Sequence, residues 1–123
     1  MLEAYSLNVA VAANSNIPFN STSVQKGCTA TRTATDTFAL NKCGVYMVAV
    51  DCSTTTSTTI QLYKDGVAQP QAQSTGLSPS FVTLVQVDKN NSCCPCASAT
   101  SIQIRNTVAG TLTDANIVIT KVA

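Results

Sequence analysis

Residues 37–50 constrain the fold more than any other part of this chain. They predict a short strand, a turn at Gly44, and a long central strand over residues 43–52. Successive side chains of a strand alternate between its faces. Both faces of this strand are apolar, with Tyr46, Val48 and Val50 on one and Val45, Met47 and Ala49 on the other. A strand of this kind must be covered on both sides. We expect one cover to be the chain's own core and the other to be a second copy of the chain.

Length and composition indicate one β domain spanning residues 1–123. A chain of 123 residues can form one core but not two. Charged residues make up only 11% of the chain, and β-branched residues, which favour strands, are abundant. Apolar residues do not recur at helical spacing over a helical length. We therefore expect an all-β fold of about eight to ten strands, arranged as a two-sheet jelly-roll sandwich.

Alternation and turn signals place the other strands. The first is expected over residues 4–12, with Tyr5 and Leu7 on one face and small residues on the other. Asp65-Gly66 predicts a hairpin turn, with Ile60 and Leu62 buried on the strand before it. Further strands are predicted at residues 29–33, 67–72, 81–87, 101–106 and 116–122.

The sequence contains no pattern that is typical of a catalytic or cofactor site. Histidine, the commonest general base and metal ligand, is absent, and the six acidic residues are isolated from one another. There is no glycine-rich phosphate loop and no serine-nucleophile motif. The formal net charge is only +1, with no basic cluster for nucleic acid and no apolar window long enough to span a membrane. We expect a protein that is not an enzyme, has no cofactor, and binds neither nucleic acid nor membrane.

Cys93-Cys94-Pro95-Cys96 is the most pronounced local motif, and the chain has three further cysteines at positions 28, 43 and 52. Disulfide stapling within or between subunits is the favoured interpretation, and free thiols without a role are the next. A zinc site would need Cys28, Cys43 or Cys52 as a fourth ligand. A redox Cys-x-x-Cys is less favoured, because the motif does not open a helix. We therefore expect no metal.

Three motifs, in this order, resemble the C1q and tumour-necrosis-factor superfamily. They are Phe38 followed by Gly44-Val45-Tyr46-Met47-Val48, then Ile60-Gln61-Leu62-Tyr63-Lys64-Asp65-Gly66, and finally Ala115-Asn116-Ile117-Val118-Ile119-Thr120-Lys121. The last is similar to the closing strand of bacterial members, such as the heads of collagen-like spore-surface proteins. The resemblance covers roughly residues 38–122, and by strand order the N-terminal part as well.

The resemblance implies a jelly roll that forms a tight homotrimer. Its first, central and last strands would lie in the inner sheet around the threefold axis, with the small face of residues 4–12 alongside the subunit contact. The residues then expected at the trimer interface or in the core are Tyr5, Leu7, Val45, Tyr46, Met47, Val48, Ile117 and Ile119.

Two functions fit these expectations. The first is a structural bacteriophage virion protein, similar to trimeric capsid-decoration and head-fibre proteins, that binds the major capsid protein or another virion protein. The first residues lack signal-peptide features, so it would be made in the bacterial cytoplasm and released by lysis. The alternative is a C1q-like adhesin or ligand-binding head on a bacterial or spore surface. It would bind a host-surface glycan or protein through loops at residues 53–59 and 69–80.

Overall fold

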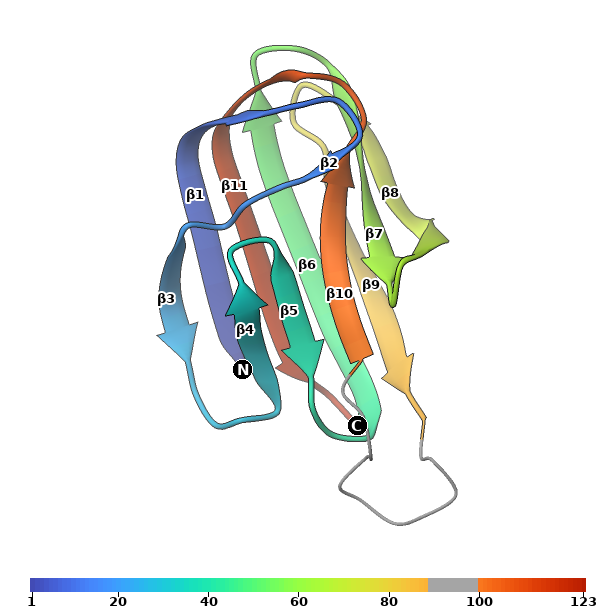
Figure 1. Cartoon of the computed structure of the whole chain (residues 1–123). Helices are drawn as coiled ribbons and strands as arrows, with labels where there is room; N and C mark the ends of the chain where they lie inside the picture. The colour runs from blue at the N-terminus through green and yellow to red at the C-terminus, as the bar shows by residue number, and fades with distance from the viewer. Residues whose placement is uncertain (89–99) are drawn as a thin grey trace.

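The structure is a computed structural model that describes residues 1–88 and 100–123. The described residues form an all-β sandwich of eleven strands (Figure 1). In chain order these are β1 (Leu2–Val11), β2 (Ser15–Asn16), β3 (Ser21–Gln25), β4 (Ala30–Ala34), β5 (Thr37–Leu40), β6 (Gly44–Thr54), β7 (Thr58–Lys64), β8 (Val67–Gly76), β9 (Ser80–Val87), β10 (Thr100–Asn106) and β11 (Gly110–Lys121). The predicted fold class, an all-β jelly-roll sandwich, is confirmed.

The strands form two antiparallel sheets. The five-stranded sheet has the order β3-β1-β11-β6-β9, and the other has the order β4-β5-β10-β7-β8, with the short β2 paired to β10. The first, central and last long strands therefore lie side by side in one sheet, as Figure 1 shows. Both chain termini lie at the same end of the sandwich, and the C-terminus is next to the β5–β6 turn.

The core fills the space between the two sheets. Its largest members are the fully buried Tyr46, Phe19 and Phe38, and the rings of Phe19 and Phe38 meet with centroids 5.6 Å apart. The Tyr46 hydroxyl donates to the carbonyl oxygen of Lys42, 2.8 Å away, so this buried phenol also anchors the β5–β6 turn. Burying its apolar ring while pairing its hydroxyl satisfies both parts of the side chain.

Several local predictions are confirmed. Asp65 and Gly66 both have positive φ, at 49° and 81°, which is the backbone conformation of a type I′ hairpin turn between β7 and β8. Ile60 and Leu62 of β7 are fully buried. Two strands were not predicted, namely β2, which has two residues, and β3, whose five residues are all exposed. Neither gives an alternation of apolar and polar residues that a sequence could reveal.

The faces of β1 are assigned differently from the sequence prediction. The small residues Ala4 and Ser6 point into the core, whereas Tyr5 and Leu7 point outward. Asn8 has a φ of 52°, and this left-handed residue interrupts the alternation, so that Val11 returns to the core. The expectation that the small face would lie at the subunit contact is therefore wrong.

Gly44, the first residue of β6, lies in direct contact with the C-terminal residues. Its φ of 139° is a conformation that side-chain-bearing residues rarely adopt, and a Cβ atom here would overlap the carbonyl oxygen of Ala123 and the side chain of Lys121. The backbone of Val45 bonds to both Val122 and Ala123 at this place. The glycine thus lets the C-terminal residues pack directly on the start of β6.

Among the described residues, no helix is both long and apolar enough to cross a lipid bilayer.

Candidate functional site

The outward side of the five-stranded sheet is apolar and uncovered, and we call it the apolar face. It is formed by alternate residues of β1, β11, β6 and β9. Three of its aliphatic side chains are largely exposed, at 63% for Leu7, 67% for Val82 and 61% for Leu84. Val45, Met47, Ala49 and Val118 are partly exposed on the same side. A contiguous apolar surface of this kind on a small protein marks an interaction site.

Strand register brings these side chains into rows across the sheet. Met47 of β6 is directly opposite Leu84 of β9, and Ala49 is opposite Val82. On its other side Ala49 is opposite Val118 of β11. Residues opposite each other on one face of an antiparallel pair are in contact distance. The apolar residues of three strands therefore form one continuous surface.

The polar groups of the apolar face are acidic or neutral. Glu3, Asp51 and Asp114 take outward positions around Asn116, which donates to the Glu3 carboxylate at 3.5 Å. No Lys or Arg occupies an outward position on the described strands of this sheet. Beneath them, burial of the Cys52 thiol, together with the negative charges of Asp51 and Asp114, raises its pKa to about 12.

A hollow of about 290 Å³ opens on the apolar face between β6, β9 and β11. Its lining comprises Ala49, Val50, Asp51, Ser80, Phe81, Val82 and Asn116. The depression forms because Ala49 is a small residue placed between the longer Met47 and Asp51 on the same side of β6. We call this depression the Ala49 hollow. It offers apolar walls together with one carboxylate and one amide.

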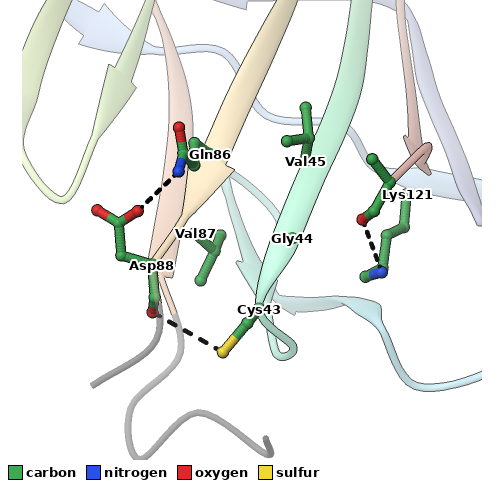
Figure 2. Close-up of a pocket in the computed structure, with 8 residues that line it drawn as sticks. Cys43, Gly44, Val45, Gln86, Val87, Asp88 and Lys121 are labelled. Atoms are coloured by element: carbon green, nitrogen blue, oxygen red, sulfur yellow. Dashed lines mark hydrogen bonds between the residues drawn. The ribbon is translucent and has the colours of Figure 1, made fainter. Parts of the chain in front are cut away.

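A second hollow, of about 400 Å³, lies at the end of the sandwich that holds the termini (Figure 2). Gly44, Val45 and Val87 form its apolar part, and Gln86 donates to the side chain of Asp88 at 2.9 Å. The Lys121 ammonium group donates to the carbonyl oxygen of Ala123 at 2.8 Å. Because these polar groups bond to one another and Asp88 leads into residues 89–99, this hollow gives no independent indication of a ligand.

The residues predicted for interface or core divide into two sets of four. Tyr46, Val48, Ile117 and Ile119 are buried between the sheets, so their assignment is to the core. The other four, Tyr5, Leu7, Val45 and Met47, lie on the apolar face. The alternation predicted for the central strand is confirmed, and packing decides that the Tyr46 side is the inner one. A subunit contact through Tyr46 is thereby excluded.

The apolar face also includes residues that the sequence interpretation did not select. These are Val82 and Leu84 of β9, which are exposed to about the same extent as Leu7. The signal was present in the sequence, because residues 81–87 are apolar at both odd and even positions around Thr83. A strand with that pattern at the edge of a sheet needs cover on its outer side as well.

The cysteines are not gathered together in the described part of the chain. Cys28 is exposed on the β3–β4 loop and Cys52 is buried near the opposite end of β6, and both are free thiols, so the disulfide expectation is wrong for these two. The sulfur of Cys43 lies 3.8 Å from the carbonyl oxygen of Asp88 (Figure 2). Cys93, Cys94 and Cys96 lie outside the described residues, so a disulfide between Cys43 and one of them stays a prediction.

Among residues 1–88 and 100–123, no three His, Cys, Asp or Glu side chains come together in a way that could hold a metal ion. Cys28 and Cys43 lie at the same end of the sandwich, on the β3–β4 loop and in the β5–β6 turn, whereas Cys52 lies near the other end of β6. Because Cys93, Cys94 and Cys96 lie outside the described residues, the zinc interpretation is not tested by them.

Comparison with known proteins identifies the architecture. No protein-family model and no curated protein matches the sequence. Among solved structures, the globular domain of zebrafish complement 1qA aligns with a TM-score of 0.75 at 11% identity, over 99% of this chain and 96% of that one. The fold is the C1q and tumour-necrosis-factor-like jelly roll.

Two further neighbours share this C1q/tumour-necrosis-factor-like jelly roll. PRD1 vertex protein P5 aligns with a TM-score of 0.69 at 14% identity, over 99% of this chain and 96% of that one. Rabbit GITRL aligns with a TM-score of 0.64 at 11% identity, over 100% and 95% of the two chains. At these identities the likeness establishes the fold alone, and the resemblance seen in the sequence motifs is confirmed at that level.

Proposed function

We propose that this chain is a non-enzymatic structural protein of a bacteriophage virion, and that it assembles as a homotrimer through the apolar face. The proposed partner on the particle is the major capsid protein or another virion protein. The observation that carries the proposal is the uncovered surface formed by Leu7, Val82 and Leu84 together with the partly exposed side chains between them.

The energetics of this surface favour its burial against a partner, which we propose is a second copy of the chain. Burial of apolar area stabilises a complex by roughly 25 cal/mol per Å², and three largely exposed aliphatic side chains are a large part of what a small interface needs. β9 itself contains neither Lys nor Pro, and the lysine at this edge is Lys64 of β7, which donates to the carbonyl oxygen of Gln86 at 2.7 Å.

The structural neighbours support the particle assignment at the level of fold. One of them is named a vertex protein, and its jelly roll aligns with nearly the whole of this chain. The neighbours described above are non-enzymatic proteins, which supports the non-enzymatic part of the proposal at the level of fold.

The test is the molar mass in solution, measured by light scattering with and without reductant. We expect three times the chain mass of 12.8 kDa in both conditions, followed by binding of the purified trimer to capsids that lack it. A trimer that dissociates on reduction would transfer the assembly role to the cysteines, including the proposed disulfide of Cys43. A monomer in both conditions would contradict the proposal.

The second candidate function is that of a ligand-binding head on a bacterial or spore surface. It is favoured by the C1q globular domain, which has the highest TM-score of the three neighbours described above. Its binding loops would lie at the end of the sandwich opposite the termini, where the β6–β7 and β8–β9 loops meet (Figure 1). Binding of the purified protein to glycans or cell surfaces, without binding to capsids, would favour this function.

A further inference from the structure

The Ala49 hollow has a shape and a chemistry that its own chain leaves unused. Ala49 and Val82 are directly opposite each other and form apolar walls, with Phe81 behind them. Asp51, two residues along β6, places a carboxylate at the rim. In the described residues no hydrogen bond is made to this carboxylate. The site therefore fits a flat apolar group that carries one hydrogen-bond donor.

Tyr5 on the same face has the complementary group. Its side chain points outward from β1, where Asn116 lies opposite, and in the described residues its hydroxyl has no hydrogen-bond partner. A tyrosine at a surface combines a large apolar ring with a polar end, which is why the residue is enriched at interfaces. A tyrosine placed here would bury its apolar ring against Ala49 and Val82, and its hydroxyl would donate a hydrogen bond to Asp51.

Tyr5 does not fill the hollow of its own copy. Asn116 of β11 lies between the two, since it is opposite Tyr5 on one side and opposite Asp51 on the other. Two strand spacings of about 4.8 Å separate the backbones, and no hydrogen bond joins the two side chains. The donor and the acceptor are thus on the same face but on different patches of it.

We propose that Tyr5 of one copy inserts into the Ala49 hollow of the neighbouring copy and donates its hydroxyl to Asp51 there. This inference deepens the proposed self-assembly and rests on it. The contact is proposed to be head-to-tail, with Tyr5 of each copy in the hollow of the next, because this is the type that can close into a ring of three. Leu7, next along the same side of β1, then covers the rim of the hollow.

The nearby charges are compatible with this contact. Glu3 lies beside Tyr5 on β1, but its carboxylate accepts hydrogen bonds from Ser23 at 2.6 Å and from Asn116 at 3.5 Å in its own copy. It is therefore held away from Asp51 of the neighbour. The inserted hydroxyl is a neutral donor to a carboxylate, a combination that gives a stronger hydrogen bond than a neutral pair.

The hydrogen bond is tested with Tyr5→Phe, Asp51→Ala and the double variant, and sedimentation equilibrium gives the dissociation constant of each. Each single substitution should weaken association about tenfold per contact, because a hydrogen bond to a charged group is lost. The double variant should be no weaker than either single one. Tyr63→Phe, on the opposite sheet, is the matched control and should leave association unchanged.

The hollow itself is tested with Ala49→Leu, which fills it with an apolar side chain that a strand accepts. We expect a folded chain, as judged by circular dichroism, that no longer assembles. If Ala49→Leu assembles like the wild type, or if the Tyr5 and Asp51 effects add, the inference is overturned while self-assembly stands. If the wild type is a monomer at all concentrations, the proposed assembly and this contact both fall.

Discussion

The outer sides of the two sheets differ in how far their side chains bond to one another. On the six-stranded sheet the outward side chains bond to one another, as when Gln103 donates to Thr37 at 2.9 Å and Thr59 meets Thr75 at 2.6 Å. Arg105 stacks over the ring of Tyr63, with its guanidinium carbon 3.9 Å from the ring centre. On the apolar face of the other sheet the polar contacts gather around Glu3, whereas Leu7, Val82 and Leu84 are largely exposed.

This difference distinguishes the outer side of the five-stranded sheet as the candidate interaction surface among the described residues. An antiparallel sheet commonly has one side packed on the core and one in water, and the six-stranded sheet follows that rule. The five-stranded sheet departs from it, because its outer side is apolar as well. Under the proposed assembly the uncovered side is the subunit contact, so a change there should alter assembly, whereas a change on the polar side should alter stability alone.

The largest expected effect is that of Leu84→Lys on assembly. The side chain is 61% exposed, so the fold should tolerate lysine, but an unpaired ammonium group inside the subunit contact would be strongly unfavourable. We expect loss of the trimer in light scattering with little change in the melting temperature. Val67→Lys, at a 63% exposed valine of the other sheet, is the matched control and should remain a trimer. Equal behaviour of the two variants would remove the distinction between the faces.

A smaller effect is expected on the free energy of unfolding when the pH rises, because of the buried Cys52 thiol beneath the acidic part of the apolar face. The pKa of Cys52 is raised from 9.0 to about 12, so the folded state retains its proton where the unfolded state loses it. Stability from this group is therefore complete below pH 9 and declines as the pH rises toward 12. Between pH 8 and pH 10.5 the decline should be about 2 kcal/mol.

This pH dependence is measured by urea unfolding of the wild type and Cys52→Ala at pH 8 and pH 10.5. The stability difference between the two proteins should shrink by that amount at the higher pH, because the variant has no thiol to titrate. An unchanged difference would mean that the thiolate is as well solvated in the folded state as in the unfolded chain.

The smallest effect is expected on the polar side. Arg105→Ala removes the stacking on Tyr63 and should lower the free energy of unfolding by about 0.5–1 kcal/mol. Association should be unaffected, and urea unfolding together with light scattering measures both quantities. Weaker association of this variant would show that the six-stranded sheet also contributes to the subunit contact, and the comparison would then need revision.

Local sequence signals predicted the elements whose causes are local. Asp-Gly specified the β7–β8 turn, because glycine and aspartate tolerate positive φ, and alternation specified β7 and β10 with their buried isoleucines. The signals did not predict β3, whose five residues are all exposed and which exists because β1 offers a partner edge. They also misassigned β1, because the left-handed Asn8 changes which residues face the core.

The candidate site was predicted only in part, for a related reason. The sequence indicated that β6 needs cover on two sides, and the structure confirms that both sides are apolar. It did not select Val82 and Leu84, nor the Ala49 hollow, because these depend on which strands lie next to β6. Register places Leu84 beside Met47 and Val82 beside Ala49, and no spacing within one strand contains that information.

The sequence by itself determined the fold class, the main strands and turns, and the presence of a two-sided apolar strand at the centre. These follow from side-chain alternation and turn chemistry, which act over a few residues. Tertiary structure decided which side of that strand faces inward. Tyr46 fits inside because its hydroxyl reaches the backbone of Lys42, and the Met47 side is left on the surface. The surface that we propose as the subunit contact thus arises from packing, because both sides of β6 are apolar and local hydrophobicity does not distinguish them.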